Sequence, residues 1–175
     1  MPVFEQPMQF LLDTMCGGLV SYLRMCNYDT VYAGDRNLEA DDDVIAAARA
    51  DNRTIVTRDS ELANRAADAI LLTAHEVDEQ LAQLHEAGVE LELPLEPAVC
   101  GRCNGRLERI DPSESTPGYA PEPGVFESET SAAGRDDGSS RSSTGPTPVW
   151  RCQSCGQYFW RGSHWDRVSE TLPGC

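Results

Sequence analysis

Two Cys-x-x-Cys pairs constrain the fold of this chain more than any other feature of its sequence. Cys100 and Cys103 stand in "CGRC", and Cys152 and Cys155 stand in "CQSC". A turn with this spacing presents two thiolates from one short loop, and two such turns supply the ligands of a tetrahedral zinc site. Each pair is followed by Gly or Asn-Gly, which permit the positive φ angles that such turns need. The sequence therefore predicts a structural four-cysteine zinc ribbon, with redox chemistry or disulfide bonds as the alternative.

The segment between the two pairs is long. Residues 111–148 are rich in Ser, Pro, Gly and acidic residues, and their sizeable apolar side chains are Tyr119, Val125 and Phe126. Such a composition is typical of disorder, and the entropy cost of closing a loop grows only logarithmically with its length. We therefore expect a ribbon built from residues 97–110 and 149–168, interrupted by a flexible insert at 111–148.

Short apolar runs alternate with helical periodicity from residue 9 to about residue 90. The pattern predicts strands at residues 9–13, 29–33, 53–57 and 69–73, with helices at 14–27, 38–52, 59–67 and 75–88. Regular alternation of this kind is typical of an α/β domain with a mostly parallel sheet. Cys16 and Cys26 fall in the first helix, where we expect small core residues, and Cys175 receives no role.

Aspartates follow two of the expected strands. Asp13 ends the first strand and Asp59 follows the third, so both belong to the edge where the carboxyl ends of parallel strands meet. Asp41, Asp42 and Asp43 open the second helix. Carboxylates converging on one point select a hard divalent cation such as Mg²⁺ or Mn²⁺, and such a site suits phosphodiester hydrolysis. The same aspartates also fit ordinary helix N-caps, and the pattern alone leaves both interpretations open.

The C-terminal segment is dense in aromatic residues and arginine. The aromatic residues are Trp150, Tyr158, Phe159, Trp160 and Trp165, and the arginines are Arg151, Arg161 and Arg167. Bases stack on exposed aromatic rings and Arg contacts the nucleic acid backbone, so this is the best candidate RNA surface. Alternatively, the aromatic residues form the core of the ribbon and dock it on the first domain. His164 fits either a phosphate contact or a structural hydrogen bond.

Composition bears on the source and the setting of the protein. The chain has 29 acidic residues, 14 Arg, no Lys and a net charge of −15, so we predict a halophilic, archaeal source. In molar salt the Debye length falls to about 3 Å, so this charge does not exclude RNA. The N-terminal segment lacks both a basic stretch and a long apolar run, which predicts a cytoplasmic protein with no membrane association.

Five segments together resemble a known family. They are, in order, "FLLDTMCGGLVSYLRMCNYDT", "DDDVIAAA", "RTIVTRDSELA", "CGRCNGRLERI" and "WRCQSCGQYFWRGSHWDRV". The chain resembles the Mut-seven C-terminal RNase domain family, whose members are predicted nucleases that join a PIN-like domain to a zinc ribbon. The resemblance covers nearly all of the chain apart from the first eight residues, the insert and the last few residues.

The resemblance implies a PIN-like domain at residues 9–90 and an acidic site that cleaves RNA, with no DNA preference expected. In it Asp13, Asp41 and Asp59 would hold Mg²⁺ or Mn²⁺, with Asp42 as their neighbour and Asp68 as a candidate fourth carboxylate. The substrate-binding candidates are Arg58, Arg161, His164 and Trp165.

The chain also departs from the family pattern. Gly18 and Tyr22 stand where the family's first helix usually has a basic residue and a Trp, which weakens the case for an RNA contact by that helix. The competing functions are a non-catalytic RNA-binding adaptor and a protein-interaction module in an RNA-processing or translation assembly.

Overall fold

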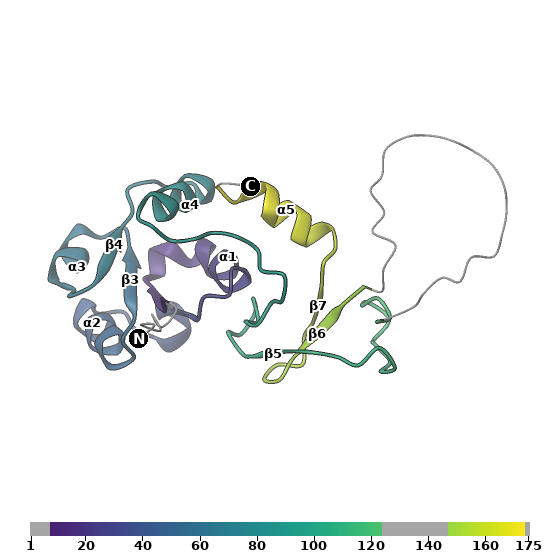
Figure 1. The fold of residues 1–175 in the computed structure, drawn as a ribbon. Helices are drawn as coiled ribbons and strands as arrows, with labels where there is room; N and C mark the ends of the chain where they lie inside the picture. Colours follow the sequence, from purple (N-terminus) through teal and green to yellow (C-terminus); the bar gives the residue numbers. More distant parts are fainter. Residues whose placement is uncertain (1–7, 124–146, 174–175) are drawn as a thin grey trace, which may run out of the picture.

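The computed structural model describes residues 8–123 and 147–173 (Figure 1). Its first unit contains a parallel sheet of four strands in the order β2-β1-β3-β4, which confirms the predicted α/β class. The strands are β1 (Phe10–Leu12), β2 (Thr30–Tyr32), β3 (Thr54–Thr57) and β4 (Ala69–Leu71). After β2 the chain crosses over β1 to form β3, so the direction of winding reverses between β1 and β3. Ligands of open parallel sheets bind beyond the carboxyl ends of the strands at such a reversal.

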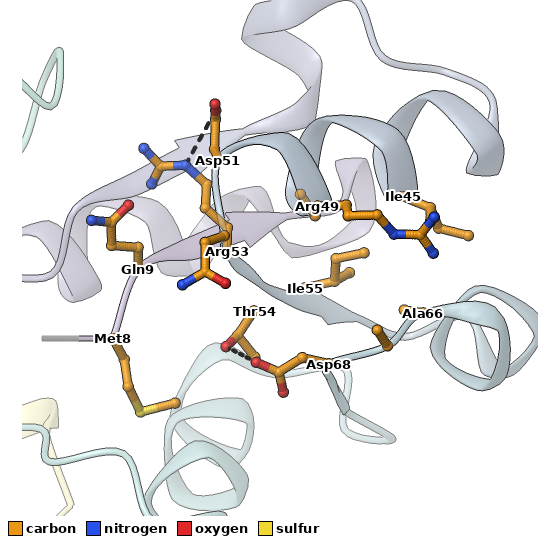
Figure 2. Close-up of a pocket in the computed structure, with 13 residues that line it drawn as sticks. Met8, Gln9, Ile45, Arg49, Asp51, Arg53, Thr54, Ile55, Ala66 and Asp68 are labelled. Carbon is orange, nitrogen blue, oxygen red and sulfur yellow. Dashed lines mark hydrogen bonds and ion pairs between the residues drawn. The ribbon is translucent and has the colours of Figure 1, made fainter. Parts of the chain in front are cut away.

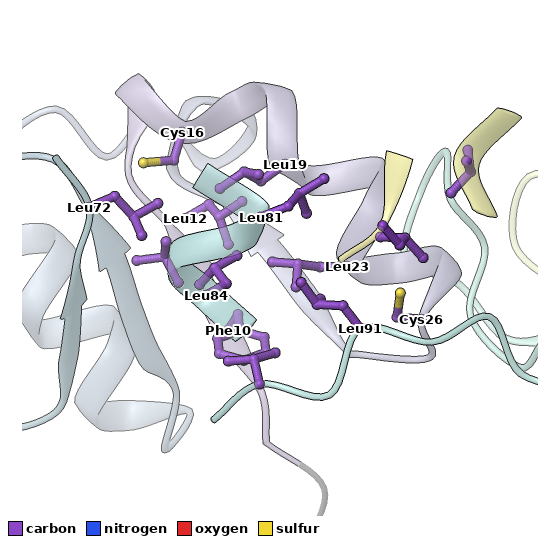
Figure 3. Close-up of a cluster of buried hydrophobic side chains, with 14 residues drawn as sticks. Phe10, Leu12, Cys16, Leu19, Leu23, Cys26, Leu72, Leu81, Leu84 and Leu91 are labelled. Carbon is purple, nitrogen blue, oxygen red and sulfur yellow. The ribbon is translucent and has the colours of Figure 1, made fainter. Parts of the chain in front are cut away.

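Helices cover both faces of this sheet. On one face Phe10 and Leu12 of β1 pack against Leu23 of α1 (Val20–Met25) and Leu81 of α4 (Val77–Glu86), as Figure 3 shows. On the other face the alternate strand residues pack against α2 (Asp41–Ala50) and α3 (Ser60–Arg65). Each fully buried Leu or Phe side chain contributes about 1.5–3 kcal/mol, so the apolar runs of β1 and β3 specify the centre of the sheet.

The first helix differs from its prediction. Residues 14–27 were expected as one helix, but the chain forms the 3₁₀ segment η1 (Thr14–Leu19), with Cys16 outside helical φ and ψ, before α1 begins. Glycine permits close contacts here. A Cβ on Gly17 would lie 3.1 Å from the Tyr32 hydroxyl oxygen, and one on Gly18 would lie 2.9 Å from Cγ2 of Val77. The tight turn lets η1 pack closely on its neighbours.

The cysteine-containing segments form an antiparallel sheet of three strands in the order β5-β6-β7. These strands are β5 (Leu107–Arg109), β6 (Val149–Cys152) and β7 (Tyr158–Trp160). A helix not predicted from the sequence, α5 (Ser163–Thr171), follows β7. Val168 of α5 and the following Leu172 join the core formed by β1, α1 and α4, so the C-terminal segment returns to the first unit (Figure 1).

The first cysteine turn lies against the amino end of β2. Asn104 accepts a hydrogen bond from the backbone N–H of Thr30 (2.9 Å), and its amide donates to the Asp29 carboxylate (2.7 Å). Buried Arg24 of α1 donates to the carbonyl of Thr30 (3.0 Å) and to the carbonyl of Arg102 in the turn (3.0 Å). These contacts connect the ribbon to the parallel sheet.

Part of the predicted insert lies within the described residues. Asp111 accepts hydrogen bonds from Ser113, and the ring of Tyr119 packs edge-on against Tyr158 at 6.3 Å between centroids. Val125 and Phe126 lie outside the described residues, so flexibility of the insert stays a prediction. Within the described residues, no helix has the length and apolar character needed to cross a lipid bilayer.

Candidate functional site

Asp13 and Asp59 lie at the same edge of the sheet, as the sequence predicted. Leu12 of β1 pairs with Val56 of β3, so the next residues, Asp13 and Thr57, emerge side by side. The Thr57 hydroxyl donates to Oδ2 of Asp13 (2.8 Å) and accepts a hydrogen bond from the backbone N–H of Asp59 (2.9 Å). One buried hydroxyl therefore connects the two aspartates at the position where the winding of the sheet reverses.

Both aspartates also cap helices, which was the alternative interpretation. Asp13 is only 9% exposed, and its Oδ1 accepts from the N–H of Thr14 (2.6 Å) at the start of η1. Asp59 Oδ1 accepts from the N–H groups of Glu61 (2.7 Å) and Leu62 (3.2 Å) at the start of α3. A carboxylate offers about four lone-pair sites. Capping therefore leaves each aspartate with acceptor capacity for a cation.

Asp41 and Asp42 meet an arginine. Nη1 of Arg65 lies 3.2 Å from Oδ2 of Asp41, and Nη2 of Arg65 contacts Asp42. Arg65 is the last residue of α3, whereas Asp59 caps the first turn of that helix. Among the described residues, the group of candidate metal ligands whose donor atoms all lie within 4.8 Å of one another is the four cysteines. A shared cation site for Asp13, Asp41 and Asp59 stays a prediction.

The proposed fourth carboxylate lies at the opposite edge. Asp68 accepts a hydrogen bond from the Thr54 hydroxyl (2.5 Å) at the amino ends of β3 and β4, so it does not join Asp13 and Asp59. It lines a pocket of about 380 Å³ (Figure 2). Arg53 and Asp51 of this pocket pair with each other at 3.6 Å. Because ligands of parallel sheets bind at the carboxyl edge, this pocket is not the candidate site.

Arg58 and His75 add nitrogen-containing side chains at the edge that carries the aspartates. Arg58 lies between Thr57 and Asp59, and its Nη2 is 2.6 Å from Nδ1 of His75, which follows β4. The Nε of Arg58 is buried and has no hydrogen-bond partner among the described residues. The carboxyl edge thus combines acidic ligands with a cationic group that suits a phosphate.

Cys16 is a thiol near this edge. Burial, reinforced by the nearby charge of Asp13, raises the pKa of the Cys16 thiol to about 11. Because only the thiolate is nucleophilic, Cys16 is inert at neutral pH. Its complete burial fits the core role predicted for it.

The four cysteines have the geometry of a metal site. Sγ atoms lie 3.8 Å apart in Cys100 and Cys155, and 3.5 Å apart in Cys103 and Cys152. A tetrahedral zinc ion with Zn–S bonds of about 2.3 Å sets its sulfur atoms about 3.8 Å apart, whereas a disulfide requires about 2.05 Å. The donor set fits a metal with four thiolate ligands and excludes the disulfide alternative.

The electrostatics of the turns differ between the two cysteine pairs. Burial raises the pKa of Cys100 to about 12 in the absence of a metal. Burial also acts to raise the pKa of Cys152, but the N–H groups of Cys155 and Ser154 point at its sulfur and lower the pKa to about 7. The backbone of the second turn therefore favours the thiolate form of Cys152, which is the form that binds a metal.

The substrate-binding candidates fall in two places. Arg58 lies at the acidic edge, whereas Arg161, His164 and Trp165 lie at the end of β7 and the start of α5. The Arg161 guanidinium lies 5.6 Å from the centre of the Trp165 ring and contacts the carbonyl of Leu95. The described contacts of these three residues do not include Asp13 or Asp59.

Several residues of the site were missed in the sequence. Thr57 could have been found, because pairing of the first and third strands at their ends sets it beside Asp13. His75 was expected at the surface of the helix at residues 75–88; it is exposed but precedes α4. The contacts of Arg65 and His75 could not be predicted, since they depend on how α2, α3 and the loop after β4 meet. The contacts of Arg24 with the first cysteine turn likewise depend on how elements distant in the sequence meet.

Comparison with protein families matches the Mut7-C RNAse domain over residues 8–172, nearly the whole chain. No curated protein and no solved structure gives a significant match. The family match agrees with the resemblance carried by the five quoted segments.

Proposed function

Because the chain belongs to the Mut7-C RNAse domain family, we propose that it is a metal-dependent ribonuclease that hydrolyses phosphodiester bonds of RNA. One observation carries the proposal beyond the family. Asp13 and Asp59 follow adjacent parallel strands at the reversal of the sheet and are connected by the hydroxyl of Thr57.

Asp13 and Asp59 are the residues that would hold Mg²⁺ or Mn²⁺, since hard cations prefer carboxylate oxygens. Asp41 and Asp42, which are now paired with Arg65, would join them by exchanging that arginine for the cation. When bound, a divalent cation supplies Lewis acidity toward the phosphate and stabilises the charge of the leaving oxygen.

The other residues of this edge would orient the aspartates and bind the phosphate of the substrate. Thr57 fixes Asp13 by donating to its Oδ2 and so keeps that carboxylate from rotating. Arg58 extends a guanidinium toward the His75 side of the edge, where it would bind a phosphate oxygen. The four-cysteine site would hold zinc, which closes the ribbon and leaves no open position for catalysis.

The test is cleavage of mixed single-stranded RNAs at high salt with Mn²⁺. Asp13→Asn and Asp59→Asn should each lower the rate at least about 100-fold, because loss of partners that merely support metal ligands already costs about 10- to 100-fold. Asp78→Asn, an exposed acid in the first turn of α4, is the matched control and should cleave like wild type. Equal rates for all four proteins would reject the catalytic assignment.

A second function is favoured by the ion pairs of Arg65 with Asp41 and Asp42, which occupy carboxylates that a nuclease would need. In that case the protein binds RNA as an adaptor without cutting it. Retention of RNA with no cleavage under Mg²⁺ or Mn²⁺ would support the adaptor. The cytoplasmic location and the halophilic, archaeal source stay predictions.

A further inference from the structure

A pocket of about 260 Å³ lies where α1, the ribbon and the start of α5 meet. Its lining is mostly apolar, and the side chains that define it are the aromatic residues Phe159, Trp160 and Trp165 with Met25 of α1. The pocket includes neither Asp13 nor Asp59, and none of the four cysteines lines it. It is therefore separate from the acidic edge, and it adjoins the first cysteine turn through Gly101 and Arg102.

Of the aromatic rings around this pocket, Phe159 packs against the ribbon core, whereas Trp160 and Trp165 lie outside that core. The chain has three Trp residues. Trp150 is 2% exposed and belongs to the ribbon's own core with Leu107, and its Nε1 donates to Glu96 (3.2 Å). Trp160 and Trp165 remain only partly buried and line the pocket. Large aromatic side chains that serve the core of a domain are usually buried, because their burial stabilises the fold. The exposed parts of Trp160 and Trp165 are therefore free to contact a ligand.

The lining of the pocket also carries polar groups. Ser21, Gln157 and His164 contribute hydrogen-bonding side chains to an otherwise apolar lining. The Arg161 guanidinium lies beside the Trp165 ring at 5.6 Å from its centre, and Arg102 also lines the pocket. Aromatic faces combined with a few donors and acceptors and with arginine are the features that bind an unstacked base of single-stranded RNA.

The size of the pocket and the charge of the chain further limit which ligands the pocket can bind. A volume of about 260 Å³ is below the range of about 300–1,000 Å³ that is typical of pockets for drug-sized ligands, so it suits a single ring system. With a net charge of −15, the chain lacks long-range attraction for a polyanion. Affinity for RNA must then come from short-range contacts such as stacking, which salt does not screen.

We propose that this pocket binds one unstacked nucleobase of a single-stranded RNA, which stacks on the aromatic side chains Trp160 and Trp165 of the lining. This inference rests on RNA being the substrate. The pocket would be a subsite that binds RNA away from the acidic edge. Arg161, whose guanidinium lies beside Trp165, provides the cation for the adjoining phosphate.

The experiment measures binding of a short single-stranded RNA that carries one 2-aminopurine, in buffer without Mg²⁺ or Mn²⁺ so that the RNA stays intact. Wild type should quench 2-aminopurine fluorescence by stacking. Trp165→Leu should weaken binding about 5- to 150-fold, the range expected for one lost stacking partner. Tyr119→Leu, an exposed aromatic residue outside the pocket, is the matched control and should bind like wild type.

A second variant tests the pocket without removing any ring. Ser21 is exposed on α1 and lines the pocket, so the longer side chain in Ser21→Met should fill the pocket. Methionine is a good helix former, so the substitution should leave α1 intact. We expect a loss of affinity similar to that of Trp165→Leu, with wild-type circular dichroism and metal content. Unchanged affinity of Ser21→Met, absence of quenching by wild type, or tighter binding of an apolar peptide than of RNA would overturn the proposal.

The two proposals fail in different ways. Quenching in wild type with no cleavage under Mn²⁺ would reject the nuclease and leave the base pocket standing. Cleavage with an unchanged KM in Ser21→Met would reject the base pocket and leave the nuclease standing.

Discussion

At the scale of single residues, the hydroxyl of Thr57 makes two hydrogen bonds that connect the candidate catalytic aspartates. Thr57 is completely buried, and its Oγ1 donates to Asp13 while accepting from the N–H of Asp59. A hydroxyl can do both at once, whereas an amide N–H or a carbonyl cannot. The side chain therefore connects the residue that follows β1 to the N-cap residue of α3.

Replacing Thr57 by Val keeps the shape of the side chain and removes the hydroxyl. Oδ2 of nearly buried Asp13 then loses its donor, so Thr57→Val should lower the free energy of unfolding by about 1–3 kcal/mol. Urea denaturation measures this, with Thr57→Ser as the control that retains the hydroxyl. If serine destabilises the protein as much as valine, the hydrogen bond is not the cause.

Asp29 provides a prediction on pH. Partial burial acts to raise its pKa, but hydrogen bonds from Arg53 and Asn104, both at 2.7 Å, outweigh burial and hold the pKa below its usual range. Because the pKa of Asp29 is lower in the folded state, its charge stabilises the fold at pH values above the pKa of the unfolded state, near 3.9. This stabilisation is lost as the pH falls through the pKa of the folded state. The Asp29 side chain is 45% exposed, so solvent screening limits the effect.

Asp29→Asn should therefore cost less than about 1 kcal/mol of unfolding free energy at pH 7, and the difference from wild type should shrink below about pH 4. Urea unfolding at a series of pH values checks both parts. A difference that stays constant down to pH 3 would mean that the charge of Asp29 does not contribute.

At the scale of elements, Arg24 joins α1, β2 and the first cysteine turn. It is 4% exposed and donates to carbonyls of Thr30, Gly101 and Arg102. Burial lowers its pKa, while the charges of Asp35 and of the thiolates of Cys100 and Cys103 act in the opposite direction. Four thiolates around a zinc ion carry a net charge of about −2, so a buried guanidinium beside them offsets part of that charge.

Arg24→Met keeps most of the length of the side chain and removes its donors. The variant should lose at least about 1.5–3 kcal/mol of unfolding free energy, the contribution of hydrogen bonds to a charged group, and should release its metal faster to a chelator. Arg49→Met, on the exposed face of α2, is the control and should change neither quantity. Identical metal release by the two variants would show that Arg24 does not support the ribbon.

Elements defined by local pattern could be predicted from the sequence, and contacts between elements could not. The runs around Leu11 and Ile55 identified the central strands because a strand buried on both faces reads as a continuous apolar segment. The cysteine spacing identified the metal site for a similarly local reason. By contrast, Arg65 meets Asp41 only because α2 and α3 lie side by side. The helix α5 was not predicted because Trp165, the aromatic residue of its first turn, was interpreted as part of a binding surface.

At the scale of the whole molecule, the ribbon and the parallel sheet share structure. Val168 of α5 and Leu172 belong to the core of the first unit, and Asn104 of the first cysteine turn bonds the amino end of β2. The four cysteines lie on both sides of the insert, in two turns that the pairing of β5 with β6 brings together and that a shared metal would hold in place. Metal at the ribbon should therefore stabilise residues of the parallel sheet that do not touch it.

Removal of the metal tests this coupling. The purified chain should contain about one equivalent of zinc. Without it the two turns lose their shared ligand, and the contacts of the first turn with Arg24 and of Asn104 with β2 weaken. Loss of about 2 kcal/mol in a chain of this length lowers Tm by at least about 4 °C. Amide protons of Thr30–Tyr32 should exchange faster, because Thr30 donates to Asn104. Cys103→Ser should reproduce both effects with no rescue by added zinc. A chelated wild type that keeps its Tm and its protection in β2 would show instead that the sheet folds independently of the ribbon.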